Sequence, residues 1–200
     1  MDISTTRELS PMTPSRTKKI PGEAGVWVFI LGDLNVFAIF FVYFLLQRSK
    51  QPELFTRSQE ILNRDFGAVN TVFLLISSLF VVLAVRAVRA NRNILAQRLL
   101  VGAFLFGVAF VVVKIFEYHE RIAAHQVPSS NEFFMLYFVL TGLHLVHLVV
   151  GLTVLTALWI FARKSELTAN QRAFFDGGAC FWHMVDLLWL VLFPLIFLVR

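Results

Sequence analysis

The chain has 200 residues, of which 58% are hydrophobic and only 16% are charged, and 22 of them are phenylalanine. A soluble domain carries about a quarter of its residues as charged side chains, so this composition excludes an ordinary soluble domain and indicates an integral membrane protein. The formal net charge of +5 does not indicate a nucleic-acid partner, because the basic residues lie between long apolar runs.

The chain begins with a polar stretch, MDISTTRELSPMTPSRTKKI, that has no apolar run of its own. We expect residues 1–24 to form a disordered tail. Five apolar segments follow, each long enough to cross a bilayer, which takes about 20 residues in a helix. They lie at about 26–46, 69–88, 99–116, 133–161 and 179–199. The sequence therefore predicts an all-α domain over residues 25–200, built as a bundle of five transmembrane helices with short polar loops.

The distribution of basic residues predicts the orientation of this bundle. The tail and the second and fourth loops hold 11 of the 18 Lys and Arg residues, and the second loop contains no acidic residue. Because cytoplasmic loops are enriched in Lys and Arg, we expect a cytoplasmic N-terminus and a periplasmic C-terminus, in a bacterial inner membrane.

An aspartate interrupts the first apolar segment. Asp33 lies in FILGDLNVF, on the helical face that also carries Phe29, Phe37, Phe40 and Phe44. An ionisable group facing lipid costs several kcal/mol, so this face is expected to pack on protein. Two interpretations are open: a hydrogen-bonded Asp in a helix interface, or a residue that relays protons or contacts a partner.

The third segment ends in KIFEYHER, where Lys114, Glu117 and Arg121 recur at helical spacing. We expect them to pair with one another at the membrane edge. A di-metal site is disfavoured, because the Glu-x-x-His pattern of ferritin-like proteins is missing from EYHE.

The fourth segment, YFVLTGLHLVHLVVG, places Thr141, His144, His147 and Gly151 on one face. Neutral imidazoles that hydrogen-bond across helices are the favoured interpretation. Ligation of haem or a metal is the alternative, although the segment offers no carboxylate or cysteine as a further ligand. Gly142 and Gly151 also predict close helix approach.

The fifth segment contains FWHMVDLLWL, in which His183 and Asp186 are helical neighbours. At this spacing the two side chains can hydrogen-bond or form an ion pair. We expect them to satisfy one another inside the bundle, beside the histidine face of the fourth segment.

Five motifs in order resemble subunit III of the haem-copper oxidase superfamily, from about Gly25 to Val199. FILGDLNVF resembles the helix with a carboxylate at the position of Asp33, and VNTVFLLISS the Asn-Thr helix start at Asn70 and Thr71. KIFEYHE resembles the Glu-Tyr segment with Glu117. TGLHLVHLVVG resembles the Thr-Gly-x-His-x-x-His helix, and FWHMVDLLWL the Trp-His-x-x-Asp-x-x-Trp helix.

The resemblance implies a non-catalytic accessory subunit with no metal, haem or redox cofactor of its own. Family members bind phospholipid between their helices and pack beside a haem-bearing catalytic membrane subunit, whose proton uptake they support. The five-helix form, in place of the common seven, occurs in ubiquinol oxidases and in the NorE-type proteins associated with nitric oxide reductase and denitrification. The segment PGEAGVWVFILGDLNVF is more similar to the NorE type.

Three other functions are open at this point. The first is subunit III of a cytochrome c or ubiquinol terminal oxidase. The second is a small proton-conducting channel or transporter that uses Asp33 and the histidines as a path. The third is a membrane metalloenzyme that uses the histidines as ligands.

Overall fold

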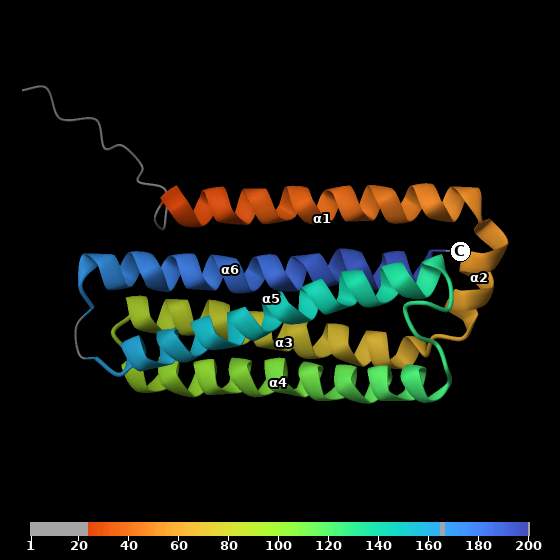
Figure 1. Ribbon diagram of the computed structural model, residues 1–200. Helices are drawn as coiled ribbons and strands as arrows, with labels where there is room; N and C mark the ends of the chain where they lie inside the picture. The colour runs from red at the N-terminus through yellow and green to blue at the C-terminus, as the bar shows by residue number, and fades with distance from the viewer. Residues whose placement is uncertain (1–23, 165–166, 200) are drawn as a thin grey trace, which may run out of the picture.

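The computed structural model describes residues 24–164 and 167–199, and it is helical throughout (Figure 1). The predicted tail lies outside the described residues, apart from Ala24. The helices are α1 (Ala24–Lys50), α2 (Pro52–Glu60), α3 (Arg64–Arg89), α4 (Asn93–Ala123), α5 (Glu132–Ala162) and α6 (Ala169–Phe193), followed by the π-helical turn η1 (Pro194–Leu198). Five of these helices are long and apolar enough to cross a membrane. The predicted all-α bundle of five spans is therefore confirmed.

Each membrane-length helix begins before its predicted apolar segment, and α1, α3, α4 and α5 also end after theirs, whereas α6 ends at Phe193 instead of residue 199. The largest differences are at α4, which continues to Ala123 instead of residue 116, and at α6, which begins at Ala169 instead of 179. Thr168 caps α6 by accepting from the backbone N–H of Gln171, whose side chain in turn accepts from the Thr168 N–H. Such a capping box starts a helix in polar sequence, so hydrophobicity alone places the start too late.

The long helices alternate in direction, and α3, α4, α5 and α6 form the core of the bundle (Figure 1). Helix α1 lies along the outside, against α6 and α5. The outer faces of the helices are apolar, with Val28 72%, Ile39 69% and Phe116 67% exposed. Large apolar surfaces of this kind suit contact with lipid or with another membrane protein.

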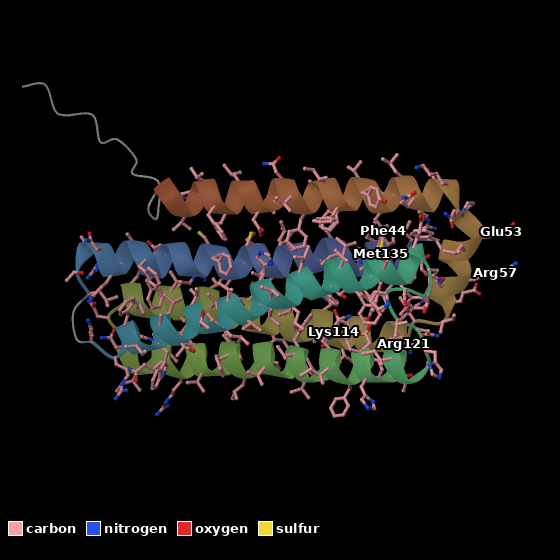
Figure 2. The ribbon with its side chains drawn as sticks, in the orientation of Figure 1. Phe44, Glu53, Arg57, Lys114, Arg121 and Met135 are labelled. Carbon is pink, nitrogen blue, oxygen red and sulfur yellow. The ribbon has the colours of Figure 1, made fainter. Side chains whose placement is uncertain are left out.

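The loop predicted between the first two spans contains the short helix α2, which crosses one end of the bundle (Figure 1). Its Phe55 is fully buried, and the ring packs edge-on against Phe44 of α1 and Phe133 of α5. Glu53 and Arg57 stay exposed on its other side (Figure 2). With one face buried and the other exposed, α2 lies across the end of the bundle and joins α1 to α5.

Helix α2 also holds the C-terminal turn. Gln59 is buried, and its Nε2 donates to the carbonyls of Ile196, at 2.9 Å, and Leu195, at 3.4 Å. Arg48 of α1 donates to the carbonyl of Val199. The last carbonyls of a helix lack partners within it, so these side chains supply donors that the turn itself does not provide.

Glycines let two helices approach the buried Trp182 of α6. A Cβ added at Gly151 of α5 would lie 2.7 Å from the Trp182 ring, and one at Gly107 of α4 would lie 2.9 Å from it. The close approach predicted at Gly151 is confirmed. The one predicted at Gly142 is wrong, since nothing lies within 4 Å of its added Cβ.

Candidate functional site

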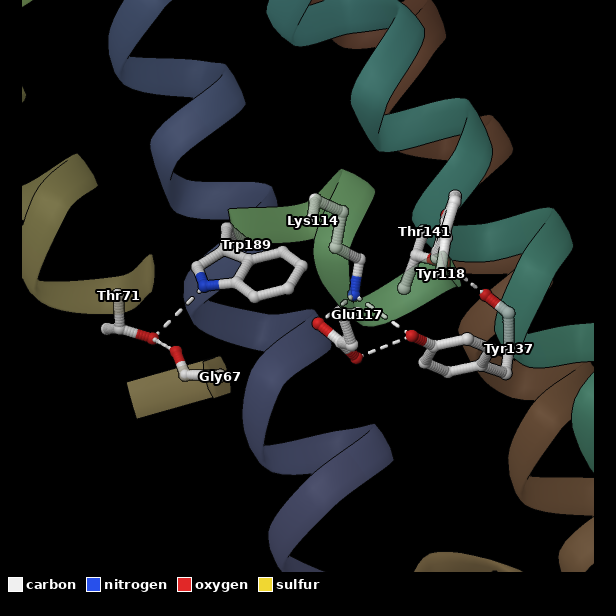
Figure 3. Close-up of polar contacts among 8 residues, drawn as sticks. All are labelled: Gly67, Thr71, Lys114, Glu117, Tyr118, Tyr137, Thr141 and Trp189. Atoms are coloured by element: carbon white, nitrogen blue, oxygen red, sulfur yellow. Dashed lines mark hydrogen bonds and ion pairs between the residues drawn. The ribbon is translucent and has the colours of Figure 1, made fainter. Parts of the chain in front are cut away.

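A lysine and a glutamate of α4 are buried together inside the bundle. Lys114 and Glu117 are each 1% exposed, and Lys114 Nζ lies 3.0 Å from Glu117 Oε2 (Figure 3). Tyr137 of α5 donates from its hydroxyl to the other carboxylate oxygen of Glu117, and Lys114 donates to the same hydroxyl at 3.3 Å. The ammonium and the carboxylate are therefore shielded from lipid, as a hydrogen-bonded group whose two charges balance.

The prediction that Lys114, Glu117 and Arg121 pair with one another at the membrane edge is only partly correct. The pair between Lys114 and Glu117 is confirmed, but it lies in the interior. Arg121 bonds instead to the Ile61 carbonyl, at 2.8 Å, and to Glu120. The buried residues of α4 form one continuous stripe, and it includes Ala96, Leu100, Ala103, Gly107, Phe110, Lys114, Glu117 and Arg121. The charged residues continue the apolar face, and for this reason they point inward.

Four aromatic rings surround the Lys114 ammonium. The Nζ atom lies 5.0 Å from the ring centroid of Tyr137, 5.2 Å from Trp189, 5.4 Å from Tyr118 and 5.7 Å from Phe197. A desolvated cation over aromatic faces gains about 2 kcal/mol or more at a favourable site. The turn η1 brings Phe197 into this set, so the C-terminal turn takes part in enclosing the charge.

Threonines extend the cluster to α3 and along α5. Trp189 of α6 donates from Nε1 to Thr71 Oγ1 at 3.0 Å, and Thr71 donates to the Gly67 carbonyl (Figure 3). Thr141 donates to the Tyr137 carbonyl at 2.6 Å. Because the single Thr141 proton goes to that carbonyl, the Tyr118 hydroxyl, at 2.6 Å, donates to Thr141.

We call these residues the Lys114 cluster: Thr71, Lys114, Glu117, Tyr118, Tyr137, Thr141 and Trp189. It joins α3, α4, α5 and α6. The predicted site residues Thr71, Glu117 and Thr141 belong to it. Tyr118, Tyr137 and Trp189 were not predicted as site residues, although Tyr118 and Trp189 lie within the motifs quoted above. The signal for Tyr137 is present in the sequence, because a lysine and a glutamate on a buried stripe require polar partners from another helix.

A second polar contact joins α1 to α5. His147 Nε2 lies 3.0 Å from Asp33 Oδ1, and His147 Nδ1 lies 2.7 Å from the Leu143 carbonyl. A carbonyl only accepts, so Nδ1 carries a hydrogen, and Nε2 and Oδ1 share one further proton between them. Asp33 and His147 are thus joined by a single hydrogen bond. The predicted packing of the Asp33 face on protein is confirmed.

The Asp33 face packs on this chain itself. Phe37 and Phe44 are buried, and Phe37 packs edge-on against the His147 ring at 5.4 Å. Phe29 is the exception, with 56% exposure. The four residues predicted on one face of α5 do not all have the same surroundings. Thr141, His144 and Gly151 are buried in the core, whereas His147 points to α1.

The predicted pairing of His183 with Asp186 is wrong as a hydrogen bond. The closest atoms are 4.0 Å apart, and His183 Nδ1 bonds to Ser78 Oγ of α3 at 2.7 Å. Asp186 is 4% exposed, and within residues 24–164 and 167–199 neither of its oxygens has a hydrogen-bond partner. The serine on a neighbouring helix lies closer to the imidazole than the carboxylate one turn along the same helix does.

Two further predicted residues are buried without a hydrogen bond from the described part of the chain. They are Asn70 of α3 and His144 of α5, both 0% exposed. The expected bond from His144 to another helix is therefore not formed, and its ring packs between Phe110, at 5.5 Å, and Trp189, at 5.2 Å. The described residues also contain no group of three or more His, Cys, Asp or Glu side chains placed to hold a metal ion.

The arrangement as a whole is suited to holding helices together. The Lys114 cluster lies within the four-helix core, and the Asp33–His147 pair lies between that core and α1. Each is assembled from different helices, so neither exists until the helices have packed.

Residues 15–199 match the protein family described as cytochrome c oxidase subunit III. The chain is 30% identical over 185 residues to the cytochrome bo(3) ubiquinol oxidase subunit 3 of Buchnera aphidicola subsp. Acyrthosiphon pisum, covering 92% of this chain and 88% of that protein. It is 32% identical over 176 residues to the cytochrome c oxidase subunit 3 of Alkalihalophilus pseudofirmus, covering 87% and 84%.

A third relative is the heme-copper oxidase subunit I+III of Aeropyrum pernix, 25% identical over 88% of this chain and 22% of that longer protein. The family match covers nearly the whole chain, and the two relatives named above are matched over most of their length. The chain therefore belongs to the cytochrome c oxidase subunit III family, as a multi-pass membrane protein whose described residues include five membrane-length helices.

Proposed function

We propose that this protein is the five-helix subunit III of a bacterial haem-copper terminal oxidase, and that it packs against the catalytic subunit I without carrying a reactive centre. The observation that carries the proposal is the similarity over most of both chains to subunits 3 of a ubiquinol oxidase and of a cytochrome c oxidase. The relative whose name joins subunits I and III in one chain supports subunit I as the partner.

The internal geometry supports a role through packing. The Lys114 cluster and the Asp33–His147 pair direct their hydrogen bonds to residues of this chain. The outer faces of the helices are apolar and exposed, as expected for surfaces that contact lipid and a neighbouring membrane subunit. The subunit would thus stabilise its neighbour and shape its proton and lipid environment.

Membership of a nitric oxide reductase complex, as a NorE-type protein, rests on the opening segment PGEAGVWVFILGDLNVF alone. The names of the relatives favour the terminal oxidase instead. The nitric oxide reductase hypothesis and the terminal oxidase hypothesis differ in the partner and in the electron acceptor, so one purification distinguishes them.

The test is affinity purification of the tagged full chain from its native membrane in a mild detergent. We expect a haem-bearing partner, seen as a Soret band and identified by mass spectrometry as an oxidase subunit I, with oxygen consumption in the purified complex. A partner that reduces nitric oxide instead would replace the oxidase proposal with the NorE reading. A chain that purifies without any haem protein would contradict both.

Deletion of the gene tests the packing role. We expect the remaining oxidase to keep its full haem content, measured by optical spectra, and to lose activity or stability in detergent. Complementation with the wild-type gene is the control. Loss of haem from subunit I in the deletion strain would contradict a role limited to packing and environment.

A further inference from the structure

An asparagine lies on the outer surface of α1, near the middle of this membrane-length helix. Asn35 is exposed, eleven residues after the helix begins at Ala24. In the central parts of α3, α4, α5 and α6 the exposed residues are apolar, except Thr153 and Thr156. Both threonine hydroxyls donate to backbone carbonyls of their own helix. An amide therefore distinguishes the outer surface of α1 from those of the other four membrane-length helices.

The Asn35 amide keeps one donor and one acceptor unused. Its Nδ2 donates to the Leu31 carbonyl of the same helix at 2.8 Å, which is its one hydrogen bond within the described residues. An amide carries two N–H hydrogens and a carbonyl oxygen, so the second hydrogen and Oδ1 remain. Lipid chains offer neither donors nor acceptors, and unpaired polar groups in hydrocarbon are costly. The amide therefore requires a polar partner inside the membrane.

Asn35 belongs to a stripe of exposed residues along α1, which we call the α1 stripe. Its members follow one another at alternating steps of three and four residues, and they are Gly25, Val28, Gly32, Asn35, Ile39, Val42 and Leu46. This is the spacing of residues that face a second helix in a left-handed helix pair. At 1.5 Å per residue, the stripe from Val28 to Leu46 is about 27 Å long, which is most of the hydrocarbon thickness of a bilayer.

The α1 stripe faces away from the bundle. Ile30, Phe37 and Phe44 lie on the opposite side of the helix and are buried, and α1 forms one side of the described bundle (Figure 1). Gly32 lies one turn before Asn35, and a Cβ added there meets nothing within 4 Å. Glycine inside a helix costs about 1 kcal/mol relative to alanine. No contact within the described residues requires this glycine, but a second helix packed closely against α1 would.

We propose that the α1 stripe binds the same stripe of a second copy of this chain, as a parallel helix pair about a two-fold axis. Both copies cross the membrane in the same direction, so the axis runs along the membrane normal and each Asn35 lies opposite its counterpart. Each amide donates its second hydrogen to Oδ1 of the other, which uses the remaining donor and acceptor of both. Gly32 opposite its counterpart lets the two backbones approach closely.

A second copy fits this surface better than a different helix does. A different helix would need a donor, an acceptor and a small residue at the depth of Asn35 and Gly32, and α1 itself provides all three there. The pair leaves the exposed faces of α3, α4, α5 and α6 open to other membrane subunits. The inference thus goes beyond the proposed function and does not depend on which respiratory complex contains the chain.

Photo-crosslinking in the native membrane identifies the occupant of the α1 stripe. Two full-length copies with different affinity tags are co-expressed, and one carries p-benzoylphenylalanine in place of Ile39. We expect ultraviolet light to give a product with twice the mass of the chain that carries both tags. The control has the same probe in place of Leu105, an exposed residue of α4, and should give no such product.

Dilution of the purified full chain in dioleoyl phosphatidylcholine liposomes measures the strength of the pair, through energy transfer between donor-labelled and acceptor-labelled copies. Asn35→Leu should raise the dissociation constant about tenfold, as expected for two interhelical hydrogen bonds in a membrane. Asn35→Gln keeps a donor and an acceptor and should retain more of the affinity. Thr153→Val is the matched control and should change nothing, because that hydroxyl bonds to its own helix.

Gly32→Leu separates loss of the pair from loss of the fold. Leucine favours a helix over glycine, and the space at this position is open, so the single copy should resist sodium dodecyl sulfate at least as well as the wild type. The dissociation constant of the pair should still rise about tenfold, because the added side chain keeps the backbones apart.

Three outcomes would overturn the proposal. A crosslinked product that contains a different protein in place of the second copy would assign the α1 stripe to another subunit. Equal amounts of the doubly tagged product from positions 39 and 105 would show random contact. An Asn35→Leu chain that associates as tightly as the wild type would show that the amide does not hold the pair.

Discussion

Lys114 shows how a single charge is accommodated in the interior of a membrane protein. Its ammonium has a carboxylate and a tyrosine hydroxyl as hydrogen-bond partners and aromatic rings around it. Each of these interactions lowers the cost of taking the charge out of water, and removing one partner of such a pair leaves the other uncompensated. The residues of the Lys114 cluster therefore depend on one another.

We expect Lys114→Met to lower the free energy of unfolding by about 3–5 kcal/mol, because it leaves Glu117 buried without a cation. The double variant Lys114→Met with Glu117→Gln should recover most of this loss. Unfolding of the purified chain by sodium dodecyl sulfate measures both. The control is Arg57→Met, which removes an exposed pair with Glu53 and should have no measurable effect (Figure 2). A single variant as stable as the wild type would contradict the proposed interdependence.

Asp33 allows a test of the hydrogen bond to His147. Asn at this position can donate to His147 Nε2, so Asp33→Asn should cost less than about 1 kcal/mol. Asp33→Leu removes the partner of His147 Nε2 and should cost about 1–3 kcal/mol. The same unfolding titration compares the two. Equal losses would mean that the hydrogen bond to His147 contributes nothing and that only the charge of Asp33 matters.

At the scale of the helices, glycine and tryptophan set how closely the core packs. Trp182 is fully buried, with Gly107 of α4 and Gly151 of α5 against its ring. In a membrane, helices associate through close van der Waals packing instead of hydrophobic burial, so small residues opposite a large ring contribute directly to stability.

We expect Gly151→Ala to lower the free energy of unfolding by about 1–3 kcal/mol, since the new methyl group would lie 2.7 Å from the Trp182 ring. The matched control is Gly142→Ala on the same helix, where the added Cβ meets nothing within 4 Å. That variant should be as stable as the wild type or slightly more stable, because alanine favours a helix. The reverse order of stability would contradict this packing.

At the scale of the whole molecule, charge and topology act together. Arg86, Arg89, Arg92 and Arg98 lie at or beside the α3–α4 turn, and Arg163 and Lys164 follow α5. These basic residues are at the same end of the bundle as the start of α1 (Figure 1). The opposite end holds α2 and the C-terminal turn. We propose that the basic end faces the cytoplasm, because cytoplasmic loops carry the excess of Lys and Arg.

Cysteine labelling tests this orientation. Ala90 and Ala124 are both exposed and each directly follows a helix, at opposite ends of α4. In a Cys180→Ser background, Ala124→Cys should react with a membrane-impermeant maleimide in intact cells whose outer membrane has been permeabilised. Ala90→Cys should react only after the inner membrane is opened. The opposite pattern would reverse the proposed orientation.

The amino-acid sequence by itself determined the class of the protein and the five membrane-length helices. In lipid every backbone polar group must be satisfied within the chain, so long apolar segments leave little choice but helices. Helical spacing also indicated that Asp33 packs on protein, because a carboxylate facing lipid is too costly. These conclusions depend on local sequence and on the solvent, and the structure agrees with them.

Only the tertiary structure decided which side chains meet. Spacing along a helix made Asp186 the expected partner of His183, but Ser78 of another helix is closer. Spacing likewise grouped His144 with His147, yet one ring enters the core and the other reaches α1. The partner of a buried polar group depends on how each helix is rotated and offset against its neighbours. That geometry comes from packing many side chains together, and the pattern along a single helix does not contain it.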